Sequence, residues 1–153
     1  MGEGVVGVRD FQRSRVYAAE KVVEPLVRYP NIEQCQSFAD HVLDRLGHKR
    51  ITVVAGHPNQ VRARGSAYKI SLPLDWAMND YIILHELAHT IISRKYGGRV
   101  AGHGEQWTSC LIGLVERFMG ATQASALMDS FARVGIAYDD ECHDAVLLGG
   151  GSC

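Results

Sequence analysis

Several features are missing from this chain of 153 residues, and each absence excludes a class of protein. No apolar run approaches the roughly 20 residues that a membrane-spanning helix needs. The four cysteines are scattered without a Cys-x-x-Cys pair, which excludes a zinc ribbon and a thioredoxin-like redox pair. The N-terminus lacks the basic segment and apolar core of a signal peptide. We therefore expect a cytoplasmic protein that does not engage a membrane and keeps its cysteines as free thiols.

Repeats, linkers and low-complexity segments are also absent, so the sequence predicts a single domain over residues 1–153. Hydrophobic residues make up 46% and charged residues 22%, which is close to the average of soluble globular proteins. A chain of this length buries enough surface to fold without a disulfide or a metal. We expect the core over about residues 10–135 and a tail over residues 136–153.

The charge is close to balanced overall but uneven along the chain. A net charge of −1 argues against a dedicated nucleic-acid binder. Residues 45–99 nevertheless hold nine Lys or Arg against three acidic residues, a local net charge of +6. Two interpretations stay open: an ordinary solvated surface, or a basic rim that attracts an acidic or nucleic-acid-associated partner.

Hydrophobic spacing predicts an α+β fold that is mostly helical, with a two- or three-stranded sheet. The helices are expected over residues 10–27, 32–46, 79–96, 104–119 and 122–134, and the strands over residues 51–55 and 67–72. Asp10 is the expected cap of the first helix. The second strand either lines a cleft and pairs with an extended peptide, or forms a sheet edge without a ligand. Trp107 is expected to pack beneath the helix at 79–96.

The segment His85-Glu86-Leu87-Ala88-His89 lies within that helix and carries the main chemical signal. A spacing of four residues places both imidazoles on one helical face, where they can bind one Zn²⁺ at about 2.0–2.1 Å. Glu86 is angled off the metal, within reach of a zinc-bound water, as a general base would be. Burying these polar groups for packing alone would be costly, which favours a metal site.

A catalytic zinc site normally has three protein ligands and one open position, so a third ligand is needed. The metzincin spacing would place Gly and His where Ile92 and Lys95 stand, which excludes that class. The candidates are His103, Glu105, Glu116 and His143. His103 is favoured because it lies between two glycines, which let the backbone approach closely and aim the ring.

The helical motif at 85–89, followed by Gly-His-Gly-Glu-Gln-Trp at 102–107, resembles the SprT-like metalloprotease domain over about residues 30–120. More narrowly, Arg-Asp-Phe-Gln-Arg-Ser-Arg-Val-Tyr-Ala-Ala-Glu at 9–20 resembles the small metallohydrolases of mycobacteria, other actinobacteria and their phages. The resemblance implies a zincin-like, gluzincin-like single domain whose sheet packs beside the metal-bearing helix. It implies zinc held by His85, His89 and His103, with Glu86 catalytic. The cysteine zinc ribbon of many SprT-like proteins is missing here, which argues against recruitment to DNA.

We therefore expect a zinc-dependent hydrolase, most simply a metallopeptidase acting on a peptide or protein, with Glu86 as general base on a zinc-bound water. Tyr96, Tyr138 and His143 are candidates to stabilise the developing oxyanion. Two alternatives stay open: a catalytically silent zinc-bearing structural or binding protein, and a zinc hydrolase of a non-peptide amide. The intact glutamate favours hydrolysis, because a structural site needs no base. Deamination is disfavoured because the Pro-Cys-x-x-Cys segment is missing.

Overall fold

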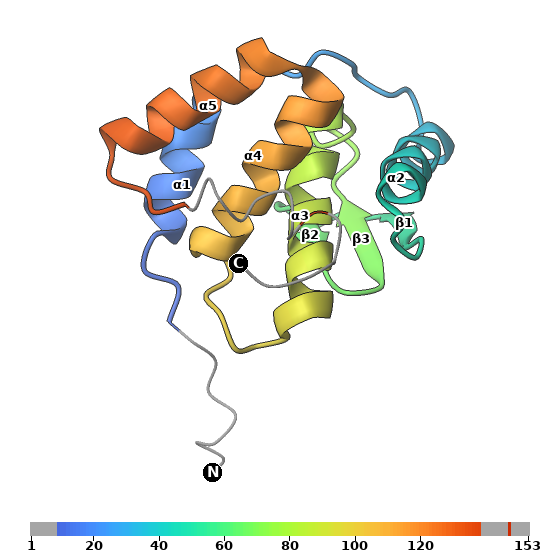
Figure 1. The fold of residues 1–153 in the computed structure, drawn as a ribbon. Helices are drawn as coiled ribbons and strands as arrows, with labels where there is room; N and C mark the ends of the chain where they lie inside the picture. The colour runs from blue at the N-terminus through green and yellow to red at the C-terminus, as the bar shows by residue number, and fades with distance from the viewer. Residues whose placement is uncertain (1–8, 139–146, 148–153) are drawn as a thin grey trace.

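The computed structural model describes residues 9–138 and Leu147. Over this part of the chain the fold is α+β and mostly helical, with five α-helices, one short 3₁₀ helix and a three-stranded mixed sheet (Figure 1). The elements are α1 (Arg13–Ala19), η2 (Glu20–Val22), α2 (Ile32–Leu46), β1 (Thr52–Ala55), β2 (Arg64–Gly65), β3 (Lys69–Leu72), α3 (Asp80–Tyr96), α4 (Glu105–Met119) and α5 (Ala121–Arg133). The predicted fold class is confirmed at this level.

Helix α3 is the centre of the molecule. The Asn79 side chain caps it by accepting a hydrogen bond from the backbone N–H of Ile82 at 2.9 Å. The helix ends at Gly97, whose φ of 60° suits glycine. Its residues are buried on nearly every face, because it contacts α4, α2 and the strands β2 and β3. Most side chains on α3 are therefore held in place by packing.

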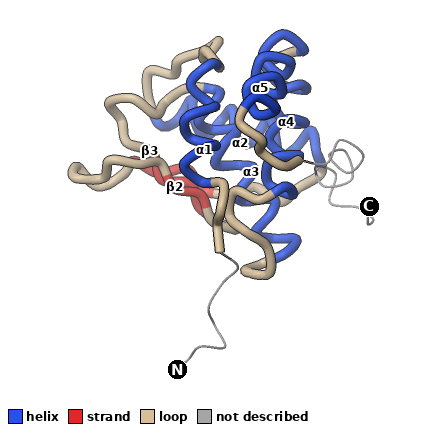
Figure 2. The backbone as a smooth tube through the Cα atoms, turned by 90° about the vertical axis from the view of Figure 1, so that its left-hand side faces the viewer, coloured by secondary structure: helices blue, strands red, loops and turns tan. Residues whose placement is uncertain are grey.

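The sheet has the order β1-β3-β2, with β1 parallel and β2 antiparallel to β3. Figure 2 shows it on one side of the helices. The predicted second strand begins later than expected, since Tyr68 precedes it and is 75% exposed, whereas Ile70 and Leu72 are buried. Both edges of β3 are paired, so the expectation that this strand adds a peptide or forms an edge is wrong. The edge strand beside α3 is β2, which the alternation of side chains did not predict.

The N-terminal segment differs most from the prediction. Instead of one helix capped by Asp10, α1 begins at Arg13 after Gln12, and the helical path ends at η2. Pro25 lacks an N–H, and the next backbone N–H is accepted by the Asp80 carboxylate at 3.1 Å. Arg28 then bridges to the residue before α3. Tertiary contacts with α3 thus override the helical spacing of this segment.

Two apolar residues that follow α5 in the sequence pack in the core. Gly135, with a φ of 68°, follows α5, and Ile136 is buried. Leu147 is fully buried in the same core, and its carbonyl oxygen is hydrogen-bonded to the His48 ring. Two residues of the expected tail, Ile136 and Leu147, thus pack in the core, whereas residues 139–146 and 148–153 lie outside the described part of the chain. Within the described part, no helix has the length and apolar character needed to cross a bilayer.

Candidate metal centre

Three histidines converge at the junction of α3 and α4. His85 and His89 lie one turn apart on α3, and His103 lies in the loop before α4. One ring nitrogen from each residue lies within 4.8 Å of the others, close enough for all three to bind one metal ion. The Nε2 atom of His103 is buried and has no hydrogen-bond partner among the described residues. A buried orphaned nitrogen that points into a histidine cluster fits a metal ligand, because its burial is otherwise uncompensated.

The other candidates for the third ligand are not part of this cluster. Glu105 and Glu116 are exposed on α4. His143 lies outside the described residues. Of the predicted ligands, the structure thus brings His85, His89 and His103 together.

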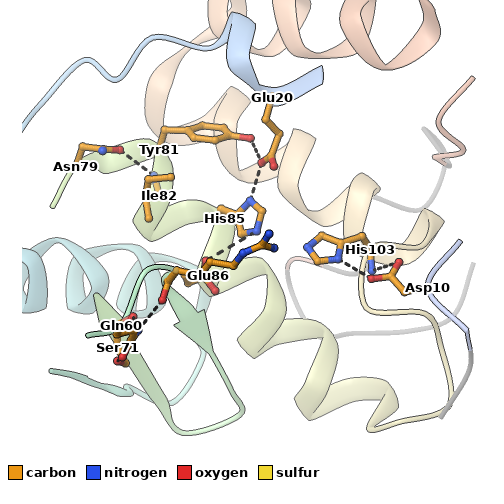
Figure 3. Close-up of polar contacts among 11 residues, drawn as sticks. Asp10, Glu20, Gln60, Ser71, Asn79, Tyr81, Ile82, His85, Glu86 and His103 are labelled. Carbon is orange, nitrogen blue, oxygen red and sulfur yellow. Dashed lines mark hydrogen bonds and ion pairs between the residues drawn. The ribbon is translucent and has the colours of Figure 1, made fainter. Parts of the chain in front are cut away.

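Two carboxylates from the N-terminal segment hold the outer nitrogens of two ligand rings (Figure 3). Glu20 Oε2 lies 2.6 Å from His85 Nδ1, and Asp10 Oδ2 lies 2.7 Å from His103 Nδ1. Asp10 Oδ1 also accepts the backbone N–H of His103 at 3.1 Å. With Nδ1–H donated to a carboxylate, the Nε2 atom of each ring faces inward with its lone pair free. Asp10 is therefore an orienting group and not the expected helix cap.

The third ring is held by stacking. His89 stacks on Trp107 with 5.2 Å between ring centroids and an interplanar angle of 22°. Trp107 is fully buried and also lies 4.8 Å from the His85 ring and 4.6 Å from the His103 ring. The prediction that Trp107 packs beneath the metal-bearing helix is confirmed. Trp107 therefore contacts the rings of all three histidines.

The electrostatic environment keeps two of the three imidazoles neutral. Burial lowers the pKa of His89 well below its ordinary value, and the neighbouring cationic forms of His85 and His103 lower it further. Burial also lowers the pKa of His103, and the hydrogen bond that its ring donates to Asp10 offsets only part of this effect. Burial lowers the pKa of His85 too, but Glu20 and Glu86 outweigh it and raise that pKa overall. Neutral imidazole is the form that binds a metal.

Glu86 is buried beside the cluster, with Oε2 3.8 Å from His85 Nε2. Burial raises its pKa above the ordinary value, while the neighbouring His85 opposes that shift. Strand β2 passes so close that a Cβ on Gly65 would lie 2.6 Å from the Glu86 backbone oxygen and 3.0 Å from its Oε1. Only glycine permits this approach, which fixes the carboxylate against the sheet. A carboxylate of raised pKa beside a metal site suits a general base.

A cavity of about 610 Å³ extends outward from His85 and Glu86. Tyr17 lines it, with its ring centroid 5.1 Å from that of His103 and 6.2 Å from that of His85. The guanidinium of Arg62 lies 5.1 Å from the Tyr17 ring centroid. Tyr17 is therefore a phenol next to two of the histidines, a residue that the sequence patterns did not single out.

The two tyrosines proposed from the sequence lie elsewhere. Tyr96 and Tyr138 pack, partly buried, against the hydrophobic core, and neither lines the cavity. The structure therefore does not support either as the oxyanion-stabilising group.

The basic stretch over residues 45–99 is partly used for structure. Arg50 forms ion pairs with Asp40 at 3.5 Å and Asp44 at 2.7 Å. Arg94 donates to the backbone carbonyls of Ala67 and Lys49. Such contacts occupy these cations within the fold, whereas Arg62 lines the cavity.

Comparison with known proteins gives no relative: no family model, no curated protein and no solved structure matches the chain. The functional argument therefore rests on the residues and their geometry.

Proposed function

We propose that this protein is a zinc-dependent hydrolase, most simply a metallopeptidase of the SprT-like, zincin-like kind. The observation that carries the proposal is the convergence of three histidine nitrogens beside the buried Glu86 carboxylate, with His85 and Glu86 lining a cavity. A peptide or protein is the proposed substrate, and the cytoplasm, where Cys35 and Cys110 stay as thiols, is the proposed location.

His85, His89 and His103 would hold the zinc. When bound, zinc supplies a Lewis acid that lowers the pKa of water toward neutrality and polarises a carbonyl group. Glu86 accepts a proton from the attacking water and later delivers it to the leaving amine. The phenol of Tyr17 donates a hydrogen bond to the carbonyl oxygen as negative charge develops there.

The surroundings support these roles. Glu20 and Asp10 hold the ligand rings in one orientation, so little reorganisation is needed during the reaction. The edge strand β2 lies directly against Glu86, where an extended peptide can pair with it by strand addition. A purely structural zinc site usually closes its fourth position with Cys or His. Here three histidines and a cavity favour a site with an open position.

Cleavage of an unfolded protein tests the proposal. Zinc-loaded wild type, Glu86→Gln and Glu116→Gln are incubated with reduced casein, and new peptide termini are identified by mass spectrometry. Glu116 is exposed on α4 and serves as the matched control. We expect new termini with wild type and the control but none with Glu86→Gln. Equal cleavage by Glu86→Gln, or none by any of the three, would contradict the proposal.

A further inference from the structure

The cavity beside Glu86 has a chemical character of its own. Its volume of about 610 Å³ lies within the range of sites that bind small ligands or side chains. Apolar side chains make up much of its wall, among them Val23, Ile82 and Trp76. The Trp76 indole is fixed by a hydrogen bond to the Val61 carbonyl at 2.9 Å, yet 44% of the residue stays exposed. An aromatic ring held in place at the mouth of an apolar cavity suits a bulky apolar group.

Three cations surround the same cavity. Lys21, Arg28 and Arg62 all line it, and none of them makes an ion pair with another described residue. The two acids in the wall are already engaged. Glu20 is bound to His85 and Tyr81, and Glu86 faces the histidines. The cavity therefore has three cations that form no ion pair with either of its carboxylates, next to apolar surface.

Apolar residues next in sequence to two of the lining cations are exposed. Leu26 and Val27, beside Arg28, are 55% and 46% exposed, and Val61, beside Arg62, is 77% exposed. Exposed apolar groups that border a cavity mark a surface for contact with a ligand or partner. Nucleic acid would need phosphate contacts repeated along a strand, whereas the three cations here line a single cavity that also has apolar side chains in its wall.

We propose that this cavity binds the part of the substrate next to the scissile bond and selects a bulky apolar side chain next to a carboxylate. The carboxylate comes either from an acidic residue or from the C-terminus of the substrate. Trp76 and Ile82 contact the apolar group, and Lys21, Arg28 and Arg62 attract the carboxylate. This inference rests on the proposed function, because it assigns a substrate class to the same site.

Binding to the zinc-loaded Glu86→Gln variant tests this selectivity without requiring turnover. Four peptides are titrated by calorimetry: acetyl-Ala-Ala-Phe-Glu-amide, its Gln and Ala-for-Phe counterparts, and acetyl-Ala-Ala-Phe with a free C-terminus. We expect the Glu peptide to bind about two- to fivefold tighter than the Gln peptide for each cation that contributes. Arg62→Gln or Arg28→Gln should reduce that preference, whereas Arg45→Gln, an exposed cation on α2, should leave it unchanged.

Trp76→Ala should weaken binding of the Phe peptides about tenfold, the loss expected for an aromatic anchor, and should leave the Ala-for-Phe peptide nearly unaffected. Tighter binding of the free C-terminal peptide than of the Glu peptide would assign the carboxylate to the chain terminus, and the reverse order to an acidic residue. Equal affinity for all four peptides, no binding, or tighter binding of a single-stranded oligonucleotide that Arg62→Gln abolishes would overturn the inference. Selective binding without cleavage by wild type would refute the hydrolase alone, and cleavage without selectivity would refute the inference alone.

Discussion

Replacing Asp10 with asparagine tests whether the N-terminal segment orients a metal ligand. Asp10 uses both oxygens: Oδ2 binds His103 Nδ1 at 2.7 Å and Oδ1 accepts the His103 backbone N–H at 3.1 Å. Asparagine has one oxygen and one NH₂ group, so one of the two donors would face another donor. The ring of His103 would lose either its orientation or its charge-assisted hydrogen bond.

Loss of such an orienting carboxylate typically weakens metal binding about 10- to 100-fold, or about 1.4–2.7 kcal/mol. Zinc affinity is measured by competition with a chromophoric chelator, and folding by circular dichroism. Asp129→Asn, an exposed acid on α5, is the matched control and should bind zinc like wild type. An Asp10→Asn protein that is folded and binds zinc within about twofold of wild type would refute the reasoning.

Three further predictions concern the site and the core. In Gly65→Ala the added Cβ would lie 2.6 Å from the Glu86 backbone oxygen, so β2 must shift, and we expect turnover to fall about 10- to 100-fold while zinc content stays unchanged. Because burial lowers the pKa of His89 and His103, their neutral forms stabilise the fold above the ordinary pKa of about 6.5. The metal-free His89→Asn variant should therefore lose less free energy of unfolding than the metal-free wild type as the pH drops below that value in urea titrations; a wild-type loss no larger than that of the variant would contradict the assignment. Leu147→Ala should cost about 2–5 kcal/mol in urea unfolding, and a loss below about 0.5 kcal/mol would show that the residue is not in the core.

The parts of the fold that the sequence predicted are those set by local signals. Helix α2 begins at the Asn31 cap and ends at Gly47, whose φ is 73°, and α3 is bounded in the same way. These caps and stops lie within a few residues of the helices that they define. The bounds of the first helix and the strand β2 were not predicted, because these conformations depend on contacts with α3 and β3.

The candidate site also has a part that the sequence predicted and a part that it did not. His85 and His89 share one helical face, so their spacing alone predicts that they meet, and the flanking glycines pointed to His103. The carboxylates that orient the rings were missed because 65 residues separate Glu20 from His85 and 93 separate Asp10 from His103. No spacing rule connects residues at such separations. Acidic residues in the segment at 9–20 were the one available signal.

Zinc content tests the central claim most directly. Wild type, His103→Ala and Glu86→Gln are purified from metal-replete medium, and their zinc is determined by elemental analysis alongside thermal unfolding. The three-histidine centre predicts about one zinc per chain in wild type and Glu86→Gln, and loss of zinc in His103→Ala. A wild-type protein without zinc, or a folded His103→Ala protein that retains a full equivalent, would contradict it.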